Sequence, residues 1–277
     1  MWKKLTTSPM DEMRADFAEK LKKDTGLLKL APANKNTGKI VTEERLDAIM
    51  PLLEKYYELW LSYPDKLIYM LLPPDTHFKL YPFQTLTLRA NMRFKRVFQT
   101  ATRGYSKSFI AVLSKLVKCI LLPRSKESMV AETKKQATAI GREKIQELTQ
   151  LMPLLEQEID RRKGSQTTFS NDYIRVKFRN KSELDIVSVE DSTRGGRRHG
   201  LLLEEAKDLP QTEINEVVLP LLAIARRSVI GILNPYEKHQ QQLYVGSAGV
   251  KDSFAYDKCI EIAVNASLDP ENNFCWG

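Results

Sequence analysis

The stretch VFQTATRGYSKSFIAVL, from Val97 to Leu113, decides the fold of this chain. It predicts a strand at Arg96 to Thr100 and a helix from Lys107 to about Leu121, because its apolar spacing changes from strand-like to helical. The loop between them ends in a Lys-Ser pair. A phosphate-binding loop of the form G-x-x-x-x-G-K-[ST] has this setting, although Ala101 and Ser106 stand here at the two glycine positions.

Such a loop binds phosphate because successive backbone N–H groups point at the anion from a helix N-terminus. Lys107 fits the side chain that reaches the β- and γ-phosphates, and Ser108 fits the hydroxyl that contacts Mg²⁺. Gly104 supplies one flexible point. A serine at position 106 costs roughly 1 kcal/mol if the backbone there needs a positive φ. The octapeptide alone leaves a second interpretation open, which is a surface loop before a charged helix start.

An acidic pair follows a second apolar segment, in HGLLLEEAKDL from His199 to Leu209. The three leucines predict a buried strand, with Glu204 and Glu205 at its carboxyl end. A nucleotide hydrolase needs one carboxylate near the metal and one that polarises the attacking water. We assign Glu204 to the metal and Glu205 to the water. The alternative is an acidic start to the next helix, which the helix dipole favours.

The glycine-rich segment DSTRGGRRHG, from Asp191 to Gly200, precedes that strand. Arg194, Arg197 and Arg198 lie on it. Arginines next to such a site can stabilise the charge that develops during phosphoryl transfer, in the same subunit or in a neighbouring one. They can also contact DNA phosphates, or form a solvated basic loop.

Strands alternate with helices from residue 80 onward, which predicts an α/β domain on a mainly parallel sheet. Ligands of such sheets bind at the carboxyl ends of the strands. Residues 1–79 are predicted to be helical, with helices near residues 8–26 and 42–63 and a third at Pro64 to Leu71. Three further predictions are a hairpin over Tyr173 to Val189, a helix at Pro210 to Ala225 and a strand at Ser228 to Leu233.

The composition narrows the possible partners. The chain has 277 residues and a net charge of +8, which favours a polyanionic partner such as nucleic acid, although a basic surface can also serve solubility. Its apolar runs are too short to span a bilayer, and no secretion signal is evident. The three cysteines are far apart without metal-binding spacing, so we expect reduced thiols.

Together these motifs resemble the ATPase domain of viral large terminases, the motors that package DNA into phage proheads. The resemblance covers about Leu80 to Val264. It implies a P-loop NTPase of the ASCE, RecA-like class, with three layers and a mainly parallel central sheet. Residues 80–277 would be the ATPase domain and residues 1–79 an N-terminal helical segment. The C-terminal nuclease domain that large terminases usually carry is expected to be absent.

The resemblance also implies roles for individual residues. Tyr81-Pro82-Phe83-Gln84 resembles the adenine-recognising segment, with Gln84 reading the base and Phe83 beside it. YVGSAG, from Tyr244 to Gly249, resembles the coupling motif, with Ser247 as the sensor of the γ-phosphate. Arg194 is the best match for an arginine acting in trans, with Arg197 and Arg198 as second choices. The remaining ATP-binding residues belong to the variant Walker A loop: Thr102, Arg103, Gly104, Tyr105, Ser106, Lys107 and Ser108.

The function implied by the resemblance is ATP hydrolysis with Mg²⁺, coupled to translocation of double-stranded DNA into a procapsid. The chain is expected to form a homo-oligomeric ring, a pentamer, on the portal of the procapsid. A small terminase subunit is a further expected partner. The expected place is the host cytoplasm, with no membrane contact. Two alternatives stay open. One is a helicase-like ATPase stimulated by nucleic acid. The other is a DNA- or capsid-binding module whose loop has lost hydrolysis.

Overall fold

The computed structural model describes residues 56–277, except 74, 163, 190–195, 228–230, 232, 235–236 and 252. The chain divides into two compact units, Met1–Met70 and Leu71–Gly277, and each is described by itself. In the first unit, residues 56–62 are helical and the α3 helix begins at Pro64 and ends at Leu71, as predicted. The helix predicted near residues 8–26 lies outside the described residues. The predicted domain boundary after residue 79 stays a prediction.

The second unit is built on one eight-stranded sheet in the order β3-β4-β5-β2-β6-β7-β1-β8. Among the described strands, all neighbours from β5 to β8 pair in parallel, and only the β3–β4 and β4–β5 pairs are antiparallel. The predicted α/β class with a mainly parallel sheet is therefore confirmed. The strands are β1 (Arg96–Thr100), β2 (Lys126–Ala131), β3 (Thr168–Phe169), β4 (Ile174–Lys177), β5 (Glu183–Ser188), β6 (Gly200–Glu204), β7 (Gln241–Gly246) and β8 (Asn273–Trp276).

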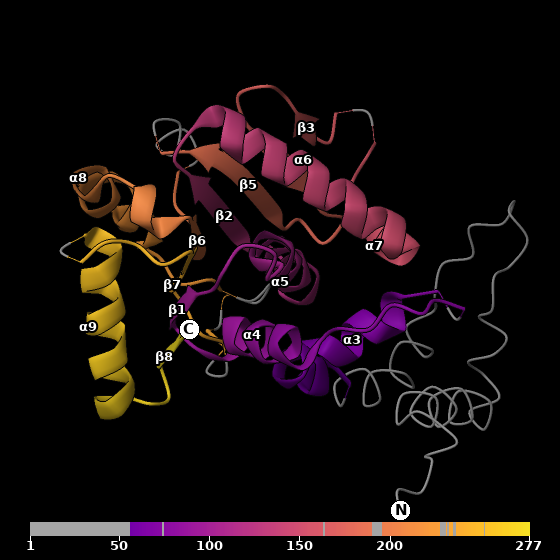
Figure 1. Ribbon diagram of the computed structural model, residues 1–277. Coiled ribbons are helices and arrows are strands. Elements are labelled where there is room, and N and C mark those ends of the chain that lie inside the picture. The colour runs from indigo at the N-terminus through magenta and orange to yellow at the C-terminus, as the bar shows by residue number, and fades with distance from the viewer. Residues whose placement is uncertain are drawn as a thin grey trace, which may run out of the picture. The chain divides into compact units, whose positions relative to one another are not determined.

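Helices cover both faces of the sheet and give the predicted three layers (Figure 1). One face carries α4 (Pro82–Arg93), α5 (Lys107–Leu121), α6 (Lys134–Leu151) and α7 (Pro153–Glu158), and the other carries α8 (Gln211–Glu213) and α9 (Phe254–Leu268). Nearly every residue of α5 is buried, which is expected of a helix that is apolar around most of its circumference. The helix that follows the loop is therefore fixed in the core.

The second face packs around the leucines of β6. Leu201 and Leu203 are fully buried and share a cluster with Tyr244 of β7 and with Phe254 and Ile262 of α9. Burying such side chains is worth roughly 1.5–3 kcal/mol each. The predicted buried strand is confirmed, and its packing fixes where the acidic pair at its end must lie.

The strand order brings three carboxyl ends together. β7 lies between β1 and β6 and pairs in parallel with both. The loop after β1, the acidic residues at the end of β6 and the residues after β7 therefore meet at one edge of the sheet. Ligands of open α/β sheets bind at this edge.

Some elements differ from the sequence predictions. The stretch predicted as a helix from Pro210 to Ala225 forms the short α8, then a π turn over Ile214–Val218 and a 3₁₀ turn over Leu219–Leu222. Pro220 has no N–H to donate, so a regular helix cannot run through it. The hairpin of β4 and β5 and its turn near Lys181 are confirmed. The strand predicted at Ser228 to Leu233 lies largely outside the described residues.

The short strands β3 and β8 were not predicted. β8 has four residues and pairs only with β1 among the described strands, so its sequence carries little periodicity. Within the described part of the chain, no helix is long and apolar enough to cross a membrane.

Candidate nucleotide-binding site

The loop after β1 contains a left-handed turn, although Ala101 and Ser106 stand at the two glycine positions of the phosphate-loop pattern. Ser106, just before α5, has φ 54° and ψ 29°, which is the left-handed conformation, and Gly104 has φ 81°. Ser106 makes no side-chain capping hydrogen bond to the helix. The left-handed turn therefore forms at Ser106 without a glycine, and the loop leads directly into the N-terminus of α5.

Lys107 is buried and holds this loop together. Its Nζ donates hydrogen bonds to the carbonyl oxygens of Ala101, at 3.0 Å, and of Thr102, at 3.1 Å. Both acceptors are neutral, so a phosphate oxygen would be a stronger partner for the ammonium group. The lysine is thus positioned at the loop by contacts that an anionic ligand can replace.

Ser108 and Glu204 form the candidate metal site. The Ser108 hydroxyl donates to Oε1 of Glu204, and Oε2 of this carboxyl is buried and has no hydrogen-bond partner among the residues that the structure describes. Burial raises the pKa of Glu204 to about 7, against a smaller lowering by the Ser108 hydrogen bond. An unpartnered buried oxygen is costly unless something pairs with it, so this donor pair suits a hard cation.

The number of protein ligands fits Mg²⁺ in particular. Mg²⁺ usually takes one or two protein oxygens and completes its shell with water and substrate phosphates. The Ser108 hydroxyl and the Glu204 carboxylate are such a pair.

Glu205 points to different partners from Glu204, as predicted for adjacent residues at a strand end. Its backbone is left-handed, with φ 46°, and its Oε2 accepts hydrogen bonds from the Ser247 N–H, at 3.0 Å, and from the Ser247 hydroxyl, at 2.9 Å. Gly246 allows this approach, since an added Cβ would lie 3.4 Å from that oxygen and 3.3 Å from the Ala206 nitrogen. The end of β7 is therefore fastened to the second glutamate.

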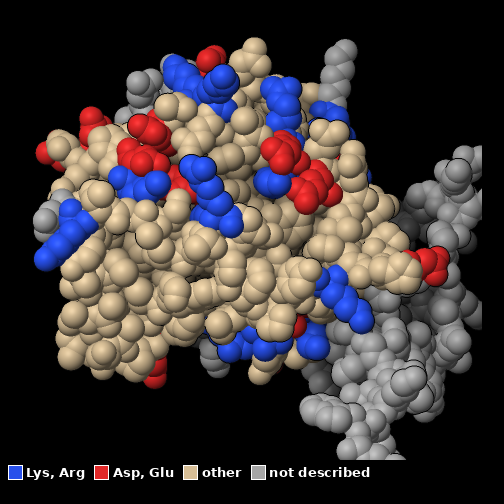
Figure 2. Space-filling view, in the orientation of Figure 1, with Lys and Arg blue, Asp and Glu red and all other residues tan. Residues whose placement is uncertain are grey.

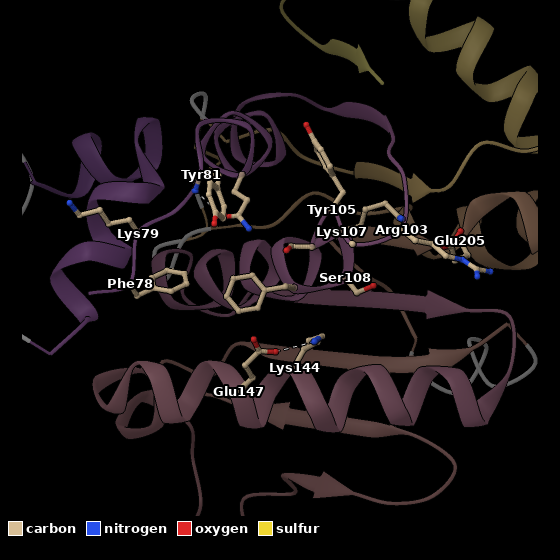
Figure 3. A pocket seen from close by; sticks show the side chains of 14 residues that line it. Phe78, Lys79, Tyr81, Arg103, Tyr105, Lys107, Ser108, Lys144, Glu147 and Glu205 are labelled. Atoms are coloured by element: carbon tan, nitrogen blue, oxygen red, sulfur yellow. Dashed lines mark hydrogen bonds and ion pairs between the residues drawn. The ribbon is translucent and has the colours of Figure 1, made fainter. Parts of the chain in front are cut away.

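A cavity of about 620 Å³ lies over the loop (Figure 3). Arg103, Lys107, Ser108 and Glu205 mark one end of it, and Tyr81 marks the other. Its full lining is Phe78, Lys79, Tyr81, Gln84, Arg103, Gly104, Tyr105, Ser106, Lys107, Ser108, Phe109, Lys144, Glu147 and Glu205. A cavity of this size suits a ligand as large as a nucleotide.

The far end of the cavity differs from the prediction in one residue. Gln84 lines it, and its Oε1 accepts from the Tyr81 N–H at 2.9 Å. Phe83 is not part of the lining; its ring lies 4.0 Å from that of Tyr105 and 5.7 Å from that of Tyr81, between centroids. Tyr81, which is 65% exposed, therefore lines the wall beside Gln84 where Phe83 was expected, and Phe83 packs against Tyr105 of the loop.

The predicted arginines do not behave alike. Arg194 lies outside the described residues. Arg197 is exposed. Arg198 is 1% exposed and pairs with Glu183, at 2.8 Å, and with Asp185 of β5. The second-choice role of Arg198 as an arginine acting in trans is wrong, because a buried side chain committed to two carboxylates cannot reach a neighbouring subunit.

Sequence reasoning missed several lining residues, among them Phe78, Lys144 and Glu147. Tyr81 belongs to the segment that was matched to adenine recognition, but the aromatic role was expected at Phe83. Lys144 and Glu147 lie on α6, and the sequence of this helix matches none of the motifs described above. Only packing of α6 beside α5 brings them to the cavity.

The strand order, the loop and the acidic pair together define a P-loop NTPase fold. No family model and no curated protein matches the chain. Among solved structures, the bacteriophage HK97 large terminase is similar with a TM-score of 0.53 and 16% identity, over 74% of this chain and 40% of that one. This likeness shows that the chain has the fold of a phage large terminase, which confirms the predicted resemblance at the level of the fold.

Two weaker similarities concern related proteins. The Thermus phage P74-26 large terminase ATPase domain has a TM-score of 0.46 and 18% identity, over 66% of this chain and 69% of that one. A large terminase from a thermophilic bacteriophage has a TM-score of 0.45 and 13% identity, over 72% of this chain and 45% of that one.

Proposed function

We propose that this chain hydrolyses ATP with Mg²⁺ and uses the energy to move double-stranded DNA into a viral procapsid. The observation that carries the proposal is the meeting of Ser108, Glu204, Glu205 and Ser247 beside a phosphate-type loop. In this proposal Ser108 and Glu204 contact the metal, Glu205 orients the attacking water and Ser247 senses the γ-phosphate. Phosphoryl transfer needs groups with these roles. The packaging role rests on the resemblance to large terminases and on the shared fold.

In this proposal the loop residues bind the triphosphate. Backbone N–H groups from Arg103 to Ser108 face the anion, and Lys107 exchanges its two carbonyl acceptors for phosphate oxygens. Ser108 and Glu204 would hold Mg²⁺, which supplies positive charge beside the phosphates when bound. Tyr81 and Gln84 enclose the base at the far end of the cavity.

Glu205 then orients the attacking water, and Ser247 links it to the sheet. The two hydrogen bonds from Ser247 hold the Glu205 carboxylate on β7. Loss of the γ-phosphate charge would alter the strength of the hydrogen bonds between Ser247 and Glu205. A resulting shift at the end of β7 would be transmitted along this strand to other parts of the domain. Ser247 is thus suited to the coupling role that its motif predicts.

The proposed assembly is a homo-oligomeric ring on a portal, expected to be pentameric, with a small terminase subunit as a further partner. Arg194, or Arg197 from the same loop, is proposed to reach the site of the neighbouring subunit. The proposed place of action is the host cytoplasm.

The test is ATP turnover with and without duplex DNA, for the native chain, Lys107→Ala and Glu205→Gln. We expect Lys107→Ala to lose nucleotide binding, and Glu205→Gln to bind ATP but to turn it over at least about 100-fold more slowly, since a positioned base contributes about that factor. Glu143→Gln is the matched control, because Glu143 is exposed and is not part of the cavity lining.

Absence of turnover in the native chain across a range of protein concentrations, or turnover that is unchanged from the native rate in both variants, would contradict the proposal. The first result favours a binding module without hydrolysis. Turnover that is stimulated by forked DNA and accompanied by strand separation favours the helicase-like alternative. Because a ring completes the site, we expect the specific turnover to rise with protein concentration.

A further inference from the structure

Besides its loop end and its Tyr81 end, the cavity has a wall formed by residues that belong to none of the sequence motifs. Lys144 and Glu147 lie on α6, one turn apart, and both line the cavity. In Figure 3 they face the cavity from the side opposite the loop, between Ser108 and Tyr81. This wall comes from the helix after β2, about forty residues beyond the phosphate-type loop.

Their place along the cavity corresponds to the middle of a bound nucleotide. Lys107, Ser108 and Glu205 gather at the phosphate end, and Tyr81 stands at the base end. The sugar of a nucleoside triphosphate lies between its phosphates and its base. A ligand held at both ends would therefore place its sugar beside α6.

The chemistry of the wall narrows what the sugar contacts. A ribose presents two neighbouring hydroxyl groups, and a carboxylate accepts hydrogen bonds from both at once. Among the described lining residues, Gln84 already uses its Oε1 for the Tyr81 N–H, and Glu205 is bound to Ser247 at the phosphate end. Glu147 is the carboxylate that remains.

Lys144 holds Glu147 in this position. The Lys144 Nζ donates to Oε2 of Glu147, at 3.0 Å, and to Oε1 of Glu143, at 2.8 Å. These hydrogen bonds raise the pKa of Lys144 above its usual value, although burial opposes them. Within the described part of the chain, the Lys144 ammonium group bonds the Oε2 of Glu147 and leaves its Oε1 available to a ligand.

We propose that Glu147 is a specificity-determining residue that accepts hydrogen bonds from the 2′- and 3′-hydroxyl groups of the bound nucleotide. Lys144 fixes its orientation. The site then prefers ribonucleoside over 2′-deoxyribonucleoside triphosphates. This inference rests on the proposed nucleotide-binding function of the cavity.

The experiment measures the Kd of Mg·ATP and Mg·2′-deoxyATP by titration calorimetry. The full chain carries Glu205→Gln throughout, so that turnover does not consume the ligand. We expect about tenfold tighter binding of ATP than of 2′-deoxyATP, the effect of one hydrogen bond to a charged group. Adding Glu147→Ala should abolish the preference, because ATP loses the contacts of both hydroxyl groups whereas 2′-deoxyATP loses only that of its 3′-hydroxyl and is weakened less. Glu147→Gln should keep part of the preference, because its amide retains one acceptor.

Glu143→Ala is the matched control, since Glu143 bonds the same lysine but does not line the cavity. It should keep the full preference for ATP. Equal binding of both nucleotides before the α6 substitutions, or equal weakening of both by Glu147→Ala, would overturn the inference and leave the nucleotide site standing. A chain that binds neither nucleotide, with Glu205 native or substituted, would overturn the proposed function and the inference with it.

Discussion

Ser106 shows how a residue can replace a glycine at a backbone cost. Its φ of 54° is a conformation that costs a non-glycine residue about 1 kcal/mol or more. The cost is offset locally, because the Lys107 ammonium group ties the loop to the carbonyls of Ala101 and Thr102 and α5 is fixed in the core. The irregular loop sequence is therefore compatible with a phosphate-binding shape.

This balance predicts the effect of substitutions at position 106. Glycine would remove the strain but add freedom to the unfolded chain, so we expect Ser106→Gly to change the free energy of unfolding by less than about 0.5 kcal/mol. Ser106→Val should lower it by about 1–2 kcal/mol, because a β-branched side chain resists this conformation. Urea unfolding measures both. Equal stability of the valine variant would show that the loop relaxes to another shape.

At the scale of elements, the start of β6 is held by buried polar groups. The Lys126 N–H donates to Nδ1 of His199 at 3.0 Å. Next to it, burial alone would raise the pKa of Glu127, but the charges of Lys115 and Lys118 outweigh this and hold it well below its usual range. Gly200 is required here, because an added Cβ would lie 2.3 Å from the Glu127 carboxylate. These contacts fix the strand that delivers the acidic pair.

The same region predicts a pH dependence of stability. Burial lowers the pKa of His199 to about 4, and its acceptor role at Nδ1 also favours the neutral ring. Between pH of about 6.5 and about 4 the unfolded chain binds a proton that the folded chain does not, so stability falls as the pH falls through this window. We expect this one group to contribute roughly 1 kcal/mol per pH unit or less, after solvent screening.

Urea unfolding from pH 7 to pH 4 would measure this contribution as a difference between variants. His199→Gln should show a shallower loss of stability than the native chain. His77→Gln, at an exposed histidine, should follow the native curve. Parallel curves for the native chain and His199→Gln would contradict the assignment to His199.

At the scale of the whole molecule, the net charge and its distribution over the surface bear on binding to DNA. The net charge of +8 favours a polyanionic partner. The face in Figure 2 carries basic and acidic side chains side by side over α6 and its neighbours, and few charges over α9. On this face the basic residues are dispersed, which is more compatible with several weak phosphate contacts than with one recognition patch.

We therefore expect binding of duplex DNA to depend on salt and hardly on sequence. Each neutralised phosphate contributes a slope of about −0.9 to log K against log salt. With four or more contacts, affinity should fall at least about 100-fold between 50 and 200 mM salt. Fluorescence anisotropy with two unrelated duplexes of equal length tests this. A flat salt dependence, or a strong preference for one duplex, would count against sequence-independent translocation.

The sequence by itself determined the local elements of this protein. The β1–loop–α5 segment, the hairpin of β4 and β5 and the buried β6 with its acidic pair follow from apolar periodicity, turn residues and breakers, which act over a few residues. The predicted bounds of β1 and the predicted start of α5 at Lys107 are confirmed. These short-range signals were also sufficient to suggest the α/β class.

Only the tertiary structure decided which residues meet. It placed β7 between β1 and β6, brought Ser247 to Glu205, turned Arg198 into the core and set Glu147 of α6 on the cavity wall. These contacts join residues that lie far apart along the chain. The packing of helices against both faces of the sheet stabilises these contacts. The spacing of neighbouring residues in the sequence does not predict that packing.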